Sequence, residues 1–169
     1  FSLTSTAGSS DVFVSKYDSS GNLIWAVSFG GAMGDFGNSI VFVDDSSIYL
    51  TGRFLDSADF DPGPGIQIVS GHGGEDIFLM KMDSSGQLNW VHVFGDIYDD
   101  EGIEARHDGT RGVLITGSFL GQADFDPGPG TALLNANGVD VFFARFSSSG
   151  ALIWARSVGG PSNERGQGI

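Results

Sequence analysis

The sequence predicts an all-β protein made of β-propeller blades, and three observations carry this prediction. An eight-residue block occurs twice, at residues 58–65 and 123–130, with its phenylalanines 65 positions apart (125 − 60). Three hairpin-like segments follow the same period. Their first arms are apolar at successive positions, which is typical of strands buried on both faces. A fixed period of this kind indicates tandem supersecondary units.

The composition limits the class of protein and the partners that the chain can have. The 169 residues are 40% hydrophobic, enough for a real core despite 27 glycines, and the absence of cysteine excludes a disulfide framework. No apolar run approaches the roughly 20 residues of a membrane-spanning helix, so we expect no membrane insertion. The net charge of −13 argues against nucleic acid and anionic membranes as partners, and it favours cations or simple solubility.

Three hairpins are predicted at residues 11–30, 76–95 and 140–159. In each, two apolar runs flank a Ser-Ser-Gly turn, where glycine can take the positive φ of a short hairpin loop. The first arms are apolar on both faces: Ile77 and Leu79 alternate with Phe78 and Met80. We therefore expect these arms to be inner strands of stacked sheets.

A second pair of apolar runs lies between successive hairpins. Residues 39–43 pair with 48–54, and residues 103–105 pair with 113–119. We expect the two connecting turns, 45–47 and 108–112, to differ in length. The register, which is the offset between equivalent residues of successive units, changes across them from 63 (103 − 40) to 65 (116 − 51). Each unit then supplies about four strands, and the repeated block forms an excursion inside the blade.

These segments divide one propeller domain into the C-terminal half of a blade at 1–30, whole blades at 31–95 and 96–160, and the start of a further blade at 161–169. A β-solenoid or an array of sandwich-like units is the alternative. The chain holds roughly 2.6 repeats, whereas a propeller closes with about 4 to 8 blades. We therefore expect an incomplete ring, completed by the remainder of a longer parent chain or by other copies.

Several motifs together resemble the bacterial SBBP-type β-propeller repeat family. They are Asp-Val-Phe-Val-x-Lys-Tyr at 11–17, Ser-Ser-Gly-x-Leu-Ile-Trp-Ala at 19–26, Ile-Tyr-Leu-Thr-Gly at 48–52 and Asp-Phe-Asp-Pro-Gly-Pro-Gly at 59–65, with matches at 76–95, 113–130 and 140–159. The resemblance implies a propeller in a large secreted or cell-surface bacterial protein, often beside adhesion modules. It brings no catalytic residues.

Two Asp-x-Asp pairs are the candidate metal ligands: Asp59 with Asp61, and Asp124 with Asp126. Ca²⁺ takes several carboxylate and carbonyl oxygens, which a Pro-Gly-Pro-Gly loop could supply. Neither block has the third acidic position and distal glutamate of an EF-hand loop. The same residues also suit a turn, in which aspartate accepts a hydrogen bond from the amide two residues on. Both interpretations stay open.

The other polar or aromatic candidates favour structural roles. The aspartates that open the hairpins are expected to bond local amides, and the histidines show no metal-binding spacing. Glu101 and Glu104 form a possible carboxylate pair, with the loop at 99–101 interpreted as solvated charge. The tryptophans are expected to pack between blades rather than stack on sugars. These residues are Asp11, Asp76 and Asp140; His72, His92 and His107; and Trp25, Trp90 and Trp154.

The sequence thus predicts a non-enzymatic extracellular scaffold or adhesion module that binds a protein or a glycan at the cell surface. Ca²⁺ is a possible stabilising ion for this module. A glycan-binding, lectin-like propeller is the first alternative. The propeller part of a secreted hydrolase is the second, and no repeated position offers it a nucleophile with its base.

Overall fold

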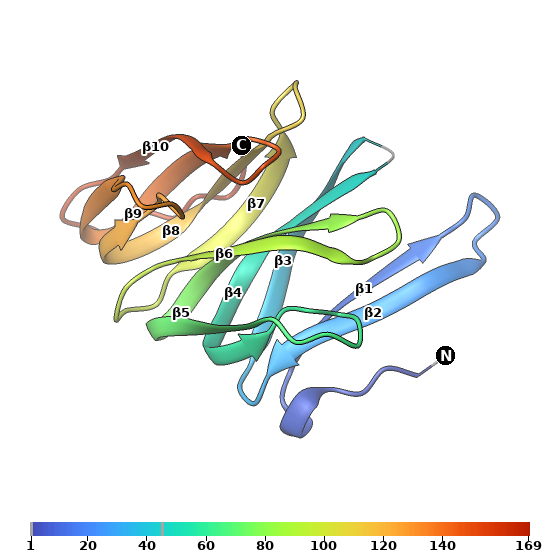
Figure 1. The fold of residues 1–169 in the computed structure, drawn as a ribbon. Coiled ribbons are helices and arrows are strands. Elements are labelled where there is room, and N and C mark those ends of the chain that lie inside the picture. Colours follow the sequence, from blue (N-terminus) through green and yellow to red (C-terminus); the bar gives the residue numbers. More distant parts are fainter. Residues whose placement is uncertain (1, 45) are drawn as a thin grey trace.

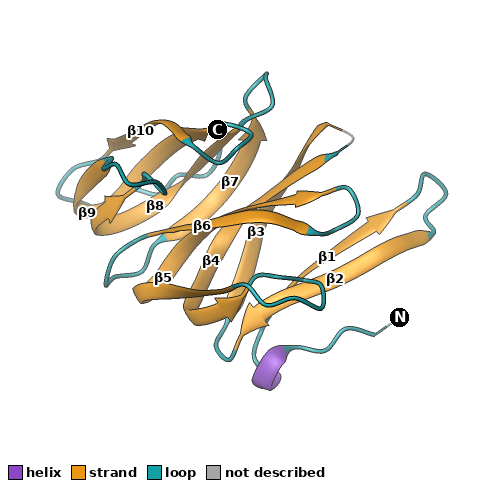
Figure 2. Cartoon of the chain, viewed as in Figure 1, coloured by secondary structure: helices purple, strands orange, loops and turns teal. Residues whose placement is uncertain are grey.

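Antiparallel strands make up most of the computed structural model, which describes residues 2–44 and 46–169 (Figures 1 and 2). Phe1, and Asp45 in the turn predicted at 45–47, lie outside the described residues. A short 3-10 helix, η1 (Thr6–Gly8), precedes the strands. The strands are β1 (Val12–Tyr17), β2 (Leu23–Gly31), β3 (Asp35–Asp44), β4 (Ser47–Asp59), β5 (Ile68–Asp83), β6 (Leu88–Phe94), β7 (Glu101–His107), β8 (Val113–Asp124), β9 (Leu133–Phe146) and β10 (Leu152–Val158).

The strands form three consecutive units. The second unit is the sheet β3-β4-β5-β6 and the third unit is the sheet β7-β8-β9-β10, each a meander in sequence order. The first unit is the hairpin β1–β2, whose strand pairing with the second unit is confined to Gly30 and Gly31 of β2 opposite Asp59 and Ala58 of β4. The described residues do not close into a ring.

The three predicted hairpins are confirmed as β1–β2, β5–β6 and β9–β10. Each Ser-Ser-Gly turn closes in the same way: the amides of Gly21, Gly86 and Gly150 each donate a 3.0 Å hydrogen bond to the carbonyl three residues earlier. These glycines have φ values of 81°, 87° and 85°, the left-handed region in which a side chain is strained.

The second pairs of apolar runs are also confirmed, as β3–β4 and β7–β8. The turns differ in length as expected, since β3 and β4 pair up to Asp44 and Ser47 whereas β7 and β8 pair only up to His107 and Val113. The expected change of register across the turns is wrong. Phe42 pairs with Ile48 and His107 pairs with Val113, so the same number of residues separates these paired positions in both units. The register is 65 throughout. The apolar residues Ile40 and Ile103 suggested 63, whereas the sheet places Ile40 opposite Leu50 and Ala105 opposite Ile115.

The repeated Asp-Phe-Asp block closes the β4–β5 and β8–β9 connections. Residues 57–59 extend β4 and pair with residues 68–70, leaving the block at the tip. Phe60 folds back into the core, where its ring centroid lies 5.2 Å from that of Phe54 and 5.3 Å from that of Phe78. The excursion predicted within each unit is therefore a hairpin tip anchored by its phenylalanine.

The units stack face to face, and each interface has its own apolar core. One core joins the first and second units through Val12, Val14 and Phe29 against Phe78 and Met80. The other joins the second and third units, and it includes Tyr49 and Leu79 against Phe142 and Phe146. Strand β7 lies against β3 and β4 (Figure 1).

Burial on both faces is confirmed for β5, whose Ile77, Phe78, Leu79 and Met80 are fully buried. It is wrong for β1, where Phe13 is 68% and Tyr17 57% exposed. The reason is that β5 lies between two units, whereas the outer face of β1 meets no further sheet among the described residues.

The C-terminal segment, residues 161–169, runs along the third unit without forming a strand. The Glu164 amide donates to the Val139 carbonyl at 2.7 Å, and the Ile169 amide donates to Glu104 Oε2 at 2.7 Å. Within the described part of the chain, no helix is long and apolar enough to cross a membrane.

Candidate functional site

A pocket of about 480 Å³ opens where the second unit, the third unit and the C-terminal segment meet. Five acidic residues and two arginines line it, together with Ser118, Val139 and Asn163. The acidic residues are Glu75, Asp99, Asp100, Glu101 and Glu164, and the arginines are Arg53 and Arg165. The excess of carboxylates gives the pocket a negative potential.

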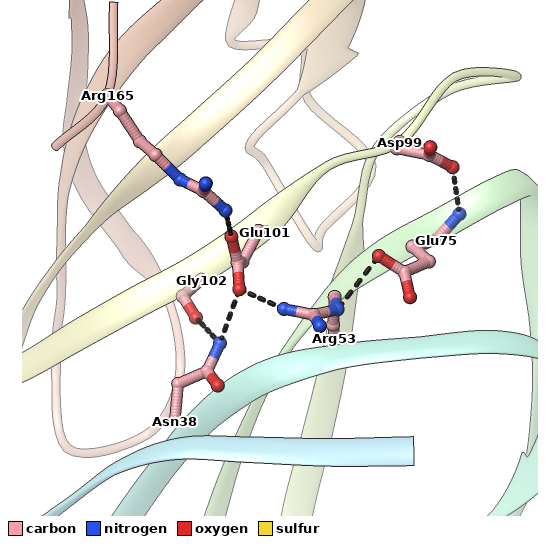
Figure 3. A network of polar contacts seen from close by, with 7 residues as sticks. All are labelled: Asn38, Arg53, Glu75, Asp99, Glu101, Gly102 and Arg165. Atoms are coloured by element: carbon pink, nitrogen blue, oxygen red, sulfur yellow. Dashed lines mark hydrogen bonds and ion pairs between the residues drawn. The ribbon is translucent and has the colours of Figure 1, made fainter. Parts of the chain in front are cut away.

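Glu101, the first residue of β7, is the hub of the charged network in Figure 3. One carboxylate oxygen pairs with the Arg53 guanidinium on β4 and accepts a 3.1 Å hydrogen bond from Asn38 on β3. The other oxygen pairs with Arg165 at 2.5 Å. The predicted solvated charge at this position is wrong: Glu101 is drawn into contacts with three separate segments of the chain.

Arg53 is bridged between two carboxylates. Its Nε atom lies 2.8 Å from Glu75 Oε2, on the side opposite Glu101 (Figure 3). The Glu75 amide in turn donates to Asp99 Oδ1 at 3.1 Å. The Arg53 guanidinium also lies 4.7 Å from the centre of the Phe36 ring, a cation–π arrangement. These contacts fix the side chains of the wall in one geometry.

Asp100 lies beneath the pocket and is 1% exposed. Its carboxylate accepts the amides of Leu120 at 2.9 Å and Asp96 at 3.0 Å. Burial outweighs these hydrogen bonds and, with the neighbouring Asp96 and Asp76 carboxylates, raises the pKa of Asp100 to about 7. The charge of the pocket floor therefore changes near neutral pH.

The predicted calcium ligands lie away from this pocket, at the tips of the β4–β5 and β8–β9 connections. Asp59 Oδ1 accepts the amides of Asp61 at 3.0 Å and Gln67 at 2.8 Å, and Asp61 Oδ1 accepts the amide of Gly63 at 2.7 Å. Asp124 and Asp126 make the equivalent bonds in the next unit. These are the turn contacts predicted as the alternative. Each carboxylate uses one oxygen in them, and calcium binding stays a prediction.

Groups of three or more His, Cys, Asp or Glu placed to hold a metal do not occur among the described residues. The histidines do not converge: His72 contacts Asp76 at 3.2 Å, and His92 stacks on Trp90 with ring centroids 4.6 Å apart. Burial lowers the pKa of His92. Glu104, the other member of the possible carboxylate pair, pairs with Arg106 at 2.8 Å and accepts the amide of Ile169.

The hairpin-opening aspartates act largely as predicted. Asp11 accepts the amide of Thr6 and Asp76 accepts the amide of His72, both at 2.7 Å. Asp140 differs, since it is 6% exposed and its Oδ1 has no hydrogen-bond partner among the described residues. The predicted packing of tryptophans between units is confirmed for Trp25 and Trp90, which lie against the two interface cores.

This pocket was not predicted from the sequence, although the comparison of successive repeats contains a signal for it. Its ten lining residues are two successive copies of five repeat positions, drawn from the second unit, the third unit and the C-terminal segment, and the residue differs between the copies at each position. The pairs are Arg53 and Ser118, Glu75 and Val139, Asp99 and Asn163, Asp100 and Glu164, and Glu101 and Arg165. Four of these five pairs differ in charge, within a scaffold that otherwise repeats, and this variation marks the pocket.

Comparison with known proteins adds a distant likeness. No protein-family model matches the chain. It is 28% identical over 143 residues to the regulatory protein FlaEY of Caulobacter vibrioides, covering 85% of this chain and 15% of that protein. It is 26% identical over 176 residues to an uncharacterised WD repeat-containing protein of Acanthamoeba polyphaga mimivirus, covering 93% and 12%. The chain thus spans less than a sixth of either relative.

Proposed function

We propose that the chain is part of a β-propeller, with the second and third units as blades and the first unit as half of a blade. Three features support this. The second and third units are four-stranded antiparallel meanders, the units stack face to face, and they repeat at about 65 residues. A relative carries WD repeats in its name, and WD repeats form propeller blades of four strands. The resemblance to SBBP repeats points the same way.

We further propose that this propeller is a non-enzymatic scaffold that recognises a partner protein through the pocket around Glu101. The observation that carries this is the set of five lining positions at which successive units differ, because binding surfaces diverge while the packing of a repeat is kept. The non-enzymatic part of the proposal is supported by the lining residues that the structure describes. They include no histidine, cysteine or lysine, and Ser118, which carries the one hydroxyl, is buried. Placement of the scaffold at the cell surface follows from the resemblance alone.

The charge of the pocket suggests the kind of partner. Five carboxyl groups face two guanidinium groups that are already paired, so a segment bearing lysine or arginine fits better than an acidic one. A glycan is the second candidate, because carboxylate and guanidinium groups also hydrogen-bond sugar hydroxyls. In that case neutral oligosaccharides would be selected instead of basic peptides.

A displayed peptide library and a glycan array, both probed with the purified chain, test the proposal. Val139→Trp places an indole in the pocket, and Val158→Trp makes the same change at a residue that is 65% exposed and lies outside it. We expect basic peptides to bind the unmodified chain and the Val158→Trp control, and to bind Val139→Trp at least about tenfold more weakly. Ligands that bind all three forms equally, or no selected ligand at all, would refute the proposed site.

A further inference from the structure

Acidic residues lie in pairs at the junctions between successive units, and the two members of each pair are 24 positions apart. The pairs are Asp11 with Asp35 (35 − 11), Asp76 with Asp100 (100 − 76) and Asp140 with Glu164 (164 − 140). In each pair, the amide of the second member donates a 2.7 Å hydrogen bond to the carbonyl just before the first member: Asp35 to Ser10, Asp100 to Glu75 and Glu164 to Val139. The same main-chain contact therefore holds all three pairs.

The middle pair, Asp76 and Asp100, is enclosed by the protein. Asp76 is fully buried and Asp100 is 1% exposed. A Cβ atom on Gly95 would overlap Asp76 Oδ1 and lie 2.8 Å from Asp100 Oδ2, so one oxygen of each carboxyl group faces the same glycine. Two carboxyl groups in such a place share a proton, because two neighbouring charges without water around them repel each other. The geometry thus favours a pair that carries one proton.

The ionisable groups next to this pair come from β5 and from the β6–β7 connection. Asp96, in that connection, directs its carboxylate to the amides of Tyr98 and Gln122, both at 2.9 Å. On β5, His72 Nδ1 lies 3.2 Å from Asp76 Oδ1, and the His72 side chain is 51% exposed. The carboxyl group of Asp100 contacts two main-chain amides and, among the described residues, no cationic side chain.

The remaining charged groups near Asp100 belong to the pocket wall above it. They are Arg53, Glu75, Asp99, Glu101, Glu164 and Arg165. Arg53 is paired with Glu75 and Glu101, and Arg165 is paired with Glu101. Carboxylates therefore outnumber guanidinium groups around Asp100, and both guanidinium groups are engaged elsewhere.

Asp100 also lines the pocket, so its ionisation changes the potential in the space where a ligand lies. Burial, with smaller contributions from the Asp96 and Asp76 carboxylates, raises the pKa of Asp100 to about 7, which agrees with a shared proton. Burial raises the pKa of Asp76 as well. Between about pH 6 and 8, the pocket floor therefore gains up to one negative charge, in a place shielded from solvent where a charge acts strongly on its neighbours.

We propose that the Asp76–Asp100 pair couples the binding of a basic segment in the pocket to the release of a proton. This inference rests on the proposed function and describes how that site is regulated. A lysine or arginine of the partner stabilises the ionised form of Asp100, so the proton passes to the solvent as the partner binds. By reciprocity, loss of the proton at higher pH strengthens the binding of the partner. The pocket then releases a basic partner in acid and holds it above neutral pH.

Isothermal titration calorimetry with a capped oligo-arginine peptide, at constant ionic strength, tests this coupling. Arginine and blocked peptide ends do not titrate near neutral pH, so a pH response belongs to the protein. We expect the unmodified chain to bind this peptide about three- to tenfold more tightly at pH 8 than at pH 6. Near neutral pH, titrations in two buffers of different ionisation enthalpy should show a net release of protons on binding. Val139→Trp, which fills the pocket, should weaken the binding at least about tenfold and so locate the peptide there.

Variants of the pair and of its neighbour separate the causes. Asp100→Asn leaves the floor without this charge, so its affinity at both pH values should match the low-pH affinity of the unmodified chain. Asp76→Asn removes the like charge beside Asp100, so the pH at which the affinity changes should fall. His72→Gln is the control for the imidazole group, which ordinarily titrates near neutral pH, and it should keep the pH response. Circular dichroism checks that each variant is folded.

The outcomes distinguish this coupling from the proposed function. Pocket binding of equal strength at both pH values, or without proton release, would overturn the coupling and leave the pocket as a binding site. A pH response that is lost in His72→Gln and kept in Asp100→Asn would overturn it too. Absence of pocket binding at every pH would refute the basic partner itself, and the coupling with it. The proton release of the unmodified chain decides the question even where Asp100→Asn does not fold.

Discussion

The indole Nε1 of Trp25 donates a 3.1 Å hydrogen bond to the main-chain carbonyl of Ser84, a residue 59 positions away in the next unit. The same carbonyl accepts Lys16 Nζ. Successive units are therefore joined by directed polar contacts at their outer ends, in addition to the apolar cores between their faces. These contacts fix the angle at which one sheet meets the next.

Replacing the two donors singly and together tests whether they act as one unit. Trp25→Phe keeps the ring over Gly86 and loses the N–H, which should lower the free energy of unfolding by about 1 kcal/mol. Lys16→Met should cost less than about 1 kcal/mol, because the Ser84 carbonyl keeps its other donor. The double variant should cost about 0.5–1 kcal/mol more than the sum, since the half-buried carbonyl then has neither donor. Strict additivity in urea denaturation would contradict this coupling.

Close backbone approach within the sheets makes a second prediction. A Cβ on Gly117 would overlap the Glu101 carbonyl and lie 2.7 Å from the Phe142 ring. Gly117→Ala should therefore lower the free energy of unfolding by about 2–4 kcal/mol. Gly160→Ala is the matched control, since nothing lies within 4 Å of its Cβ position, and it should change stability by less than about 0.5 kcal/mol. Equal effects of the two replacements would contradict the packing described here.

The pH dependence of stability should reflect Asp35, which is 3% exposed. Its Oδ2 accepts the Gly31 amide at 2.7 Å, while its Oδ1 has no partner among the described residues. Burial, with a smaller contribution from the Asp11 carboxylate, raises the pKa of Asp35 to about 6. The folded state thus binds the proton more tightly than the unfolded state, so stability falls as pH rises from about 4 through about 6.

Asp35→Asn keeps an oxygen for Gly31 and removes the charge. Relative to the unmodified chain, it should be more stable at pH 8 by on the order of 1–2 kcal/mol, with a smaller gain at pH 4. Asp18→Asn provides the opposite case. Hydrogen bonds, chiefly from Asn22, lower the pKa of the exposed Asp18. The Asp18 carboxylate therefore contributes stability that is lost as pH falls. Denaturation curves at both pH values measure these differences. A gain for Asp35→Asn that is independent of pH would rule out titration of this group.

The Asp-Phe-Asp loops give a prediction that separates hydrogen bonding from charge. Asp59→Ala leaves the amides of Asp61 and Gln67 without their acceptor and should cost about 1–2 kcal/mol of unfolding free energy. Asp59→Asn retains an acceptor oxygen and should cost less than about 1 kcal/mol. Thermal melts of both variants provide the measurement, and equal losses would show that the carboxylate charge matters more than the turn.

Calcium stabilisation of the same loops has its own test. Ca²⁺ should raise the melting temperature, a chelator should lower it, and combined replacement of Asp61 and Asp126 by asparagine should remove the response. A melting temperature that ignores both calcium and chelator would assign these aspartates to the turns alone.

Period and apolar pattern were enough to predict the strands and their pairing, because inward-facing residues such as Leu79 and Phe142 repeat with the units. The register of β3 and β7 was harder. Ile40 and Ile103 are similar residues, but the sheet places Ala105 at the position of Ile40. Local similarity misled the alignment where the small Ala105 packs in the tight interface between the second and third units.

The pocket and the indole–carbonyl contacts between units depend on contacts between residues far apart in sequence. Glu101 meets Arg165 and Arg53 only after the sheets stack, and no spacing within one unit announces that meeting. Trp25 and Trp90 were predicted to pack between units, but their hydrogen bonds to Ser84 and Ser148 join residues 59 and 58 positions apart and form only in the stacked sheets. Phe13 is likewise exposed because no further sheet covers β1 among the described residues, whereas Phe78, at the same repeat position, is buried between two units.

Hydrogen exchange of the indole N–H groups, followed by nuclear magnetic resonance, tests the contacts between units most directly. Trp25 and Trp90 should exchange slowly, because each donates to a main-chain carbonyl in the turn of the next unit. The half-buried Trp154 is the internal reference and should exchange faster. Exchange of Trp25 and Trp90 as rapid as that of Trp154 would contradict these contacts.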